Sequence, residues 1–188
     1  IVFAEADQYN VLKAAYKIKE EKIAEPILLG RQEKIMSLIE DNSLEFGNVN
    51  IIDPKSDELQ NKVKYYADKL WKKRSRSGFT EYNSRKLMRE RNFFASMMVE
   101  LGDADAMISG FTRNYPETIK PALQIVGTKY HNKKVAGLFI IMTNRGPLFI
   151  ADTTININPN SEELADITEL VADTVEKFGI KSSLKEAK

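Results

Sequence analysis

Short apolar runs alternate with helical patterns along the first third of the chain, and this alternation limits the folds that it can adopt. The apolar runs cover residues 1–4, 26–30 and 49–52, and each stops at a polar or glycine-containing turn. Between the first two runs, apolar side chains recur at helical spacing from Val11 to Ile18, and Asp7 is expected to cap this helix. Strands that alternate with helices in this way usually pair in parallel. We therefore expect an α/β fold with a parallel sheet and crossover helices.

Two further helices are expected before the next strand. Apolar residues at helical spacing from Leu59 to Leu70 indicate the first helix, which ends near Gly78. Thr80 is suited to cap the second helix, whose apolar face continues to Leu101.

Residues 102–127 read GDADAMISGFTRNYPETIKPALQIVG and are the most informative part of the chain. A short buried strand at residues 106–108 is expected to end in Ser109 and Gly110. A polar loop then leads into a helix with Pro116 near its first turn. A strand-end loop that feeds a helix start is a common place to hold an anion.

The pattern changes after Gly127. Residues 134–142 and 148–157 are two apolar runs joined by a short turn, which predicts an antiparallel hairpin. Asn160 and Glu163 form a capping box for a last helix that ends at Gly179.

One hairpin and one helix cannot easily cover both faces of their sheet. Later chain or a second subunit should therefore complete this core. We assign residues 1–110 to a parallel-sheet domain and residues 111–188 to an incomplete second domain. Because Ile1 is not an initiator Met and lies in a strand-like run, the chain is expected to be a fragment.

Composition excludes several kinds of site. The 188 residues include no cysteine, which removes disulfides and thiolate chemistry and is compatible with a cytoplasmic setting. His131 is the only histidine, so one chain cannot build a multi-histidine metal site. No apolar run approaches the roughly 18 residues of a membrane span, and we expect no signal peptide.

The charge is unevenly distributed, although the net charge is only +1. Residues 62–91 contain eleven Lys and Arg but three Asp and Glu. The segment is either a solvated helix face or a surface for an anionic ligand. Nucleic acid is the less favoured partner, because the segment has neither interleaved aromatic residues nor a known recognition motif.

Three cations have both a structural and a functional interpretation. Arg74 lies near a helix end, where it either complements the helix C-terminus or clamps a phosphate. Arg113 and Lys120, around the polar loop, have the same two interpretations. Ser109 at the strand end is usually only a turn former, and no histidine nearby would activate it as a nucleophile.

Asp152 and Thr153 place polar groups within an otherwise apolar strand. Such groups need hydrogen-bond partners when they are buried. They belong either to a structural hydrogen-bond network or to the wall of a ligand cleft.

Together, several of these segments resemble the phosphate acetyltransferase family over nearly the whole chain. The segments are residues 1–7, 24–30, 53–54, 70–80, 102–127 and 151–154. Residues 108–116 and 149–156 are closer to one branch of the family, in which this domain is fused behind the catalytic part of an NADP-dependent malic enzyme.

The resemblance implies a phosphotransacetylase-like two-domain α/β fold, an inter-domain cleft that binds coenzyme A and phosphate, and a homo-oligomer. A family arginine of the cleft falls on Arg74. A second falls on Lys120, which keeps the charge but loses the bidentate fork. The residues implied to bind acyl-CoA or phosphate are Arg74, Ser109, Gly110, Thr112, Arg113, Lys120, Asp152 and Thr153. The family's catalytic Ser-Asp region lies beyond Lys188, so no catalytic residue is assigned here.

Two functions follow as hypotheses. In the first, the chain is a non-catalytic domain of a malic enzyme that senses acetyl-CoA and supports assembly. The malic part, absent from this chain, would use NADP and a divalent metal (Mg or Mn) to convert malate to pyruvate. In the second, the chain is the N-terminal part of an active phosphate acetyltransferase. Both hypotheses expect a small-molecule acyl-CoA ligand and neither nucleic acid nor a membrane as partner.

Overall fold

The computed structural model describes residues 1–128, 135–152 and 154–179. The chain divides into two compact units, residues 1–127 and 128–188. Each unit has its own sheet and is described by itself below.

Unit 1 contains a four-stranded sheet in the order β3-β2-β1-β4. Its strands are β1 (Val2–Phe3), β2 (Ile27–Leu29), β3 (Asn50–Ile52) and β4 (Met107–Ile108). Every neighbouring pair is parallel, and Val2 lies opposite both Ile27 and Met107. The predicted parallel sheet is confirmed.

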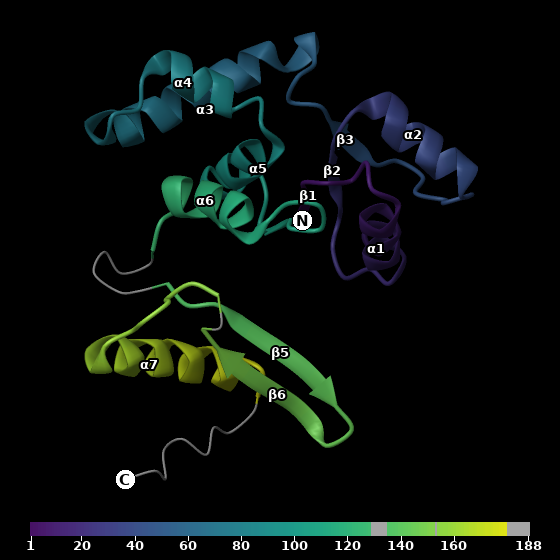
Figure 1. The fold of residues 1–188 in the computed structure, drawn as a ribbon. Coiled ribbons are helices and arrows are strands. Elements are labelled where there is room, and N and C mark those ends of the chain that lie inside the picture. The colour runs from purple at the N-terminus through teal and green to yellow at the C-terminus, as the bar shows by residue number, and fades with distance from the viewer. Residues whose placement is uncertain (129–134, 153, 180–188) are drawn as a thin grey trace. The chain divides into compact units, whose positions relative to one another are not determined.

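Helices cover both faces of this sheet (Figure 1). One face carries α1 (Tyr9–Glu20) and α2 (Gln32–Asp41), and the other carries α3 (Gln60–Arg74), α5 (Arg91–Glu100) and α6 (Tyr115–Ile125). Successive strand residues point to opposite faces. Accordingly, Phe3 belongs to the core under α1 and α2, whereas Val2 belongs to the core under α3 and α5.

The direction of strand order reverses at β1. The chain moves outward through β2 to β3 and then returns to place β4 on the other side of β1. In open α/β sheets, such a switch point opens a crevice at the carboxyl ends of the strands. The strand at residues 106–108 was expected to be buried, but β4 is an edge strand of the described sheet and Ile108 is 45% exposed.

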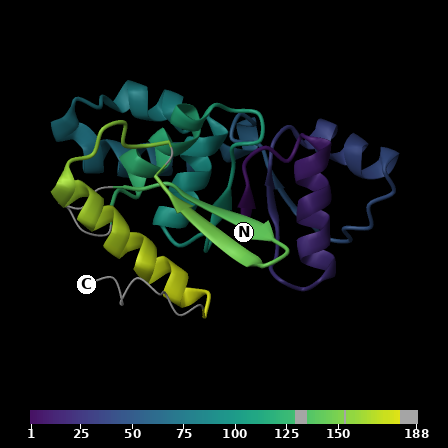
Figure 2. The same ribbon diagram turned by 60° about the horizontal axis from the view of Figure 1, so that its bottom comes forward.

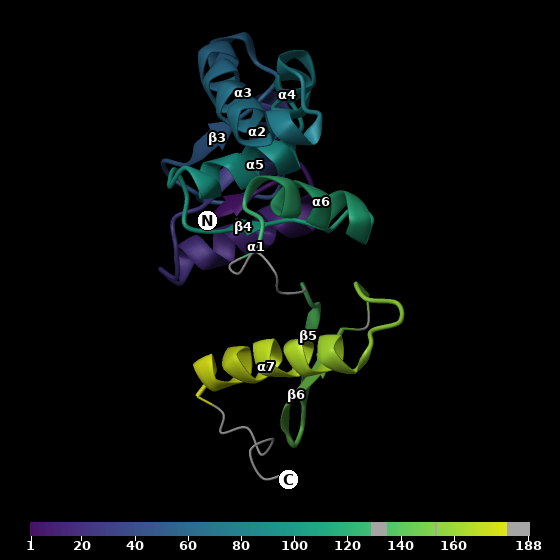
Figure 3. The ribbon, with the colours of Figure 1, turned by 90° about the vertical axis from the view of Figure 1, so that its left-hand side faces the viewer.

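The helix predicted from Thr80 to Leu101 is two helices. Thr80 caps α4 (Glu81–Leu87) as predicted, with its Oγ1 accepting a bond of 3.1 Å from the Asn83 amide. The prediction of one continuous helix is wrong, because Glu90 adopts extended backbone angles (φ −89°, ψ 129°) before α5 begins. Short 3-10 turns flank α3 at Asp57–Leu59 (η1) and Ser75–Ser77 (η2), and α3 packs beside α4 (Figure 3).

Unit 2 contains the predicted antiparallel hairpin and last helix (Figure 2). Strands β5 (Leu138–Thr143) and β6 (Gly146–Ala151) are joined by a two-residue turn, and α7 (Ser161–Lys177) contacts β6. The capping box of Asn160 and Glu163 is confirmed. The prediction that the second strand reaches residue 157 is wrong, because Asp152 has φ 52° and turns the chain away.

Many apolar side chains of unit 2 are accessible in the described structure. On the hairpin, the exposed fractions of Phe139, Ile140, Ile141, Met142 and Leu148 lie between 41% and 77%. Their cover by later chain or a second subunit stays a prediction, as does the inter-domain cleft.

The compact units also differ in extent from the predicted domains, 1–110 and 111–188, since α6 packs on α5. Within the described ranges, no helix is both long and apolar enough to cross a membrane.

Candidate functional site

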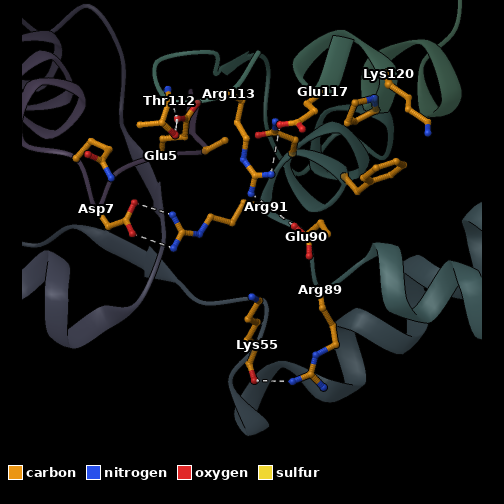
Figure 4. A pocket seen from close by; sticks show the side chains of 15 residues that line it. Glu5, Asp7, Lys55, Arg89, Glu90, Arg91, Thr112, Arg113, Glu117 and Lys120 are labelled. Carbon is orange, nitrogen blue, oxygen red and sulfur yellow. Dashed lines mark hydrogen bonds and ion pairs between the residues drawn. The ribbon is translucent and has the colours of Figure 1, made fainter. Parts of the chain in front are cut away.

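A pocket of about 480 Å³ lies in unit 1 at the carboxyl ends of the strands (Figure 4). This volume is in the range of small-molecule sites. Its walls come from the loops after β1, β3 and β4, from the break between α4 and α5, and from α6. The lining residues are Ala4, Glu5, Asp7, Gln8, Lys55, Arg89, Glu90, Arg91, Asn92, Phe93, Thr112, Arg113, Glu117, Lys120 and Pro121.

One wall is built around the carboxylate of Glu5, which is only 4% exposed. It accepts hydrogen bonds from the backbone amides of Gly110 (2.7 Å), Phe111 (3.1 Å) and Thr112 (2.6 Å). The hydroxyls of Ser109 (3.1 Å) and Thr112 also donate to it. The loop after β4 therefore holds the carboxylate of the protein's own Glu5, and binding of a ligand anion by this loop stays a prediction.

These donors keep Glu5 charged. Burial acts to raise the pKa of Glu5, but the hydrogen bonds from the Thr112 hydroxyl and the loop amides outweigh it and hold the pKa below its ordinary value. A charged acceptor strengthens each bond, so the carboxylate ties the end of β1 to the loop after β4.

A second acidic residue of the same loop is paired with a cation. The two carboxylate oxygens of Asp7 accept from the two Nη atoms of Arg91, at 2.6 and 3.0 Å, and Lys34 lies 3.6 Å away. Burial acts to raise the pKa of Asp7, but Arg91 and then Lys34 outweigh this effect and lower it. The expectation that Asp7 caps α1 is wrong, because Gln8 is the N-cap and the Asp7 carboxylate turns to Arg91 instead.

The structure brings five of the sequence-predicted residues to this pocket or its wall. Thr112, Arg113 and Lys120 line it, and Ser109 and Gly110 belong to the loop that holds Glu5. The Ser109 hydroxyl also lies 2.8 Å from Asn92 Oδ1, so polar partners surround it on both sides.

Arg74 lies elsewhere in unit 1. Its Nε donates to the carbonyl of Gln124 (2.6 Å) and its Nη2 to the carbonyl of Leu123 (2.9 Å). Arg74 thus satisfies carbonyl groups in the last turn of α6, where helices leave such groups without partners. The geometry favours the structural interpretation, in which Arg74 complements a helix C-terminus. The helix is α6, and not α3, which contains Arg74 itself.

Asp152 belongs to unit 2 and forms a local hydrogen-bond network. Its Oδ1 accepts from the Gly137 amide (3.3 Å), and its Oδ2 accepts from the amide (3.1 Å) and side chain (2.6 Å) of Asn156. This arrangement matches the structural alternative for the residue. Thr153 lies outside the described residues, and ligand binding by either residue stays a prediction.

Sequence reasoning did not find Glu5, Asp7, Lys55 or Arg91 as site residues. The signal that was available is positional: two acidic residues directly follow the first strand of a parallel sheet, where carboxyl ends converge. No sequence pattern around Arg91 indicated a site residue. Arg91 lines the pocket because the chain is not helical between α4 and α5, and the sequence was read as one continuous helix there.

Comparison with known proteins identifies the family. Residues 1–184 match the family described as phosphate acetyl/butaryl transferase. The chain belongs to this family. The predicted family and its α/β fold are therefore confirmed.

Curated relatives fall into two groups. A phosphate acetyltransferase of Bacillus subtilis is 34% identical over 96% of this chain and 54% of its own length. A probable NADP-dependent malic enzyme of Rickettsia prowazekii is 31% identical over 96% of this chain and 23% of its own length. The chain thus spans about half or less of the relatives that it matches.

Solved structures agree with this assignment. A EutD phosphotransacetylase from Staphylococcus aureus superposes with a TM-score of 0.82 at 29% identity, covering 95% of this chain and 53% of that one. A phosphotransacetylase from Streptococcus pyogenes gives a TM-score of 0.81 at 30% identity, covering 96% and 54%.

The pKa shifts at Glu5 and Asp7 predict acid sensitivity. Both carboxyl groups have a lower pKa in the folded protein than the ordinary value expected in the unfolded chain. The charged carboxylates therefore stabilise the fold fully above about pH 4.5, and this stabilisation is lost as the pH falls through the pKa values of the folded protein. Urea unfolding between pH 6 and pH 3 should show this loss. Glu5→Gln should be less stable at pH 6 and show a shallower decline, whereas Glu117→Gln, at an exposed position, should follow the wild type. If the unfolding free energy of Glu5→Gln declined with pH in parallel with that of the wild type, the lowered pKa of Glu5 would be contradicted.

Arg74→Ala should destabilise unit 1. The substitution leaves two α6 carbonyl groups without a charged donor, and the expected loss is about 1.5–3 kcal/mol of the free energy of unfolding. Arg76→Ala is the matched control, since Arg76 is an exposed arginine two residues away. Chemical denaturation of both variants measures the difference, and equal stability of the two would exclude the helix-end role.

Proposed function

We propose that this domain binds acyl-CoA and acts as a regulatory and assembly module of an NADP-dependent malic enzyme. The proposal rests on which charged and polar groups of the pocket already have partners within the protein and which do not. The loop amides that would suit a phosphate are already occupied by Glu5, whereas Lys120 faces the pocket. No carboxylate of the described residues lies within 4.0 Å of the Lys120 ammonium group.

This arrangement suits binding better than transfer. Acetyl transfer to phosphate requires the phosphate to be held in line with the thioester. An arginine fork can fix phosphate through two contacts, whereas a lysine contributes a single mobile charge. Lys120 therefore supplies attraction for an anionic ligand without fixing the geometry of a second substrate.

In this proposal the parent enzyme oxidatively decarboxylates malate to pyruvate. Its malic part would hold NADP and a divalent metal (Mg or Mn), and the present domain would report the level of acetyl-CoA. The parent protein would be a cytoplasmic homo-oligomer, a dimer or a higher assembly. The exposed apolar hairpin of unit 2 supports an assembly role, since such surfaces commonly mark interaction sites.

The alternative is an active phosphate acetyltransferase that moves an acetyl group between coenzyme A and phosphate. The 34% identity to the phosphate acetyltransferase of Bacillus subtilis favours it, as do the two phosphotransacetylase structures. In that case the present chain supplies part of the binding cleft, and the chemistry depends on residues beyond Lys188.

Two assays on the full-length protein separate the functions. We expect malate-dependent NADP reduction that changes when acetyl-CoA is added, and little or no acetyl phosphate from acetyl-CoA and phosphate. The physical reason is the missing arginine fork at Lys120. Robust acetyl phosphate formation with no malate activity would overturn the regulatory proposal and establish the alternative.

Lys120→Ala should weaken acetyl-CoA binding by about 1.5–3 kcal/mol, the range for one lost hydrogen bond to a charged group. Lys72→Ala is the control, because Lys72 is an exposed lysine on α3 that does not line the pocket. Calorimetric titration of the full-length protein measures both. An unchanged affinity of Lys120→Ala would remove Lys120 from the binding site.

A further inference from the structure

A further cavity of unit 1 is lined by cations and by no carboxylate of the described residues. Its volume is about 570 Å³, which is in the range of small-molecule sites. It is formed by α3, by α4 and by the residue Arg89 that follows α4, and the two helices pack side by side (Figure 3). We call this cavity the α3–α4 groove. Its lining residues are Gln60, Asn61, Val63, Lys64, Tyr82, Arg85, Lys86 and Arg89.

The cations of the α3–α4 groove come from both ends of the basic segment, residues 62–91. The lining residues from Tyr82 to Arg89 follow the spacing i, i+3, i+4 and i+7, so they share one face of α4 and the turn after it. Lys64 joins them from the first half of α3. The fold therefore gathers these cations at one cavity, which a solvated helix face does not require.

Three of the four cations have no carboxylate partner. The exception is Arg85, which is paired with Glu81 at 2.6 Å. Lys64, Lys86 and Arg89 form no ion pair within the part of the chain that the structure describes. Arg89 donates to a backbone carbonyl (3.3 Å), and this neutral acceptor leaves its charge uncompensated. Like charges that line one cavity repel each other, so an anion with several charges would stabilise the groove.

The kinds of cation favour phosphate groups over a single carboxylate. A guanidinium such as that of Arg89 can bind phosphate oxygens through two contacts, and lysines add point charges that adjust to the ligand. One carboxylate cannot neutralise three cations. Adjacent phosphate groups, in contrast, place several negative charges on one small ligand.

The α3–α4 groove also offers contacts for a nucleobase. Tyr82 lines the groove and is 76% exposed, so its ring is not used by the core. Exposed aromatic rings beside cations stack on nucleobases. Gln60 and Asn61 add side-chain amides, which can both donate to and accept from the edge of a base. Gln60 Nε2 donates to the Ser56 carbonyl (3.3 Å), which orients this amide.

The α3–α4 groove is distinct from the pocket of Figure 4. Arg89 is the one residue that lines both of them. Lys120 lines the pocket and not the groove. Substitutions at Lys64 and Lys120 can therefore separate binding at the two places.

We propose that the α3–α4 groove is a binding site for a nucleoside polyphosphate. The phosphate groups contact Lys64, Lys86 and Arg89, and the base stacks on Tyr82. The site is separate from the acyl-CoA pocket proposed above and does not depend on which of the two functions holds.

Calorimetric titration of the full-length protein with ATP and with inorganic tripolyphosphate, both free of divalent metal, tests the site. Lys64→Ala and Lys86→Ala should each weaken both ligands about tenfold, as expected for one lost charge-assisted contact. Lys64→Arg should retain most of the affinity because it keeps the charge. Both lysines are exposed, so these substitutions leave the core intact. Lys17→Ala is the control, since Lys17 is an exposed lysine on α1 outside the groove.

Tyr82→Ala tests the nucleoside part of the ligand. It should weaken ATP and leave tripolyphosphate unchanged, whereas Tyr82→Phe should retain the affinity for ATP because it keeps the ring. Equal affinity for the two ligands, with no effect of Tyr82→Ala on either, would overturn the assignment of the nucleoside.

Lys120→Ala separates the groove from the pocket. It should leave the affinity for ATP and tripolyphosphate unchanged, because Lys120 does not line the groove. Weakening by Lys120→Ala without any effect of Lys64→Ala would place the phosphates in the pocket and overturn the proposal, as would the absence of binding to the wild type. Failure of the wild type to bind acetyl-CoA would instead overturn the proposed function and leave this site unaffected.

Discussion

The carboxylate of Glu5 is the interaction on which the site depends. It connects two segments that lie about a hundred residues apart in the sequence, the end of β1 and the loop after β4. These segments meet at the switch point of the sheet, where the crevice opens. Without the carboxylate, the three loop amides would lose their charged acceptor.

The same interaction changes how a ligand can be held. Strand-end loops in this position commonly present their amides to an external anion. Here Glu5 occupies the loop amides, so a ligand of the pocket would meet cationic side chains instead, among them Lys55, Arg89 and Lys120. Side chains on flexible stems attract anions well but position them less tightly than fixed amides or an arginine fork.

The features that the sequence predicted correctly are mainly local ones. The strand and helix alternation, the caps at Thr80 and Asn160 and the tight hairpin each depend on a few neighbouring residues. The features it missed depend on distant partners. The chain breaks between Leu87 and Arg91, and Arg91 at the start of α5 pairs with Asp7, which lies 84 residues earlier and is not indicated by the local pattern. Asp152 likewise ends β6 through bonds to Gly137 and Asn156, although its neighbours read as a continuing strand.

The structural role of Arg74 would also be detected in a binding assay. Its two bonds hold the carbonyls of Leu123 and Gln124, in the last turn of α6. The preceding turn of that helix carries Lys120, which lines the pocket of Figure 4. Loss of Arg74 would therefore displace Lys120, and it would weaken the acyl-CoA binding proposed above without any contact between the arginine and the ligand. A change in affinity alone cannot distinguish the two roles. The distinction lies in whether affinity falls with stability, as it must if Arg74 acts by holding α6 in place.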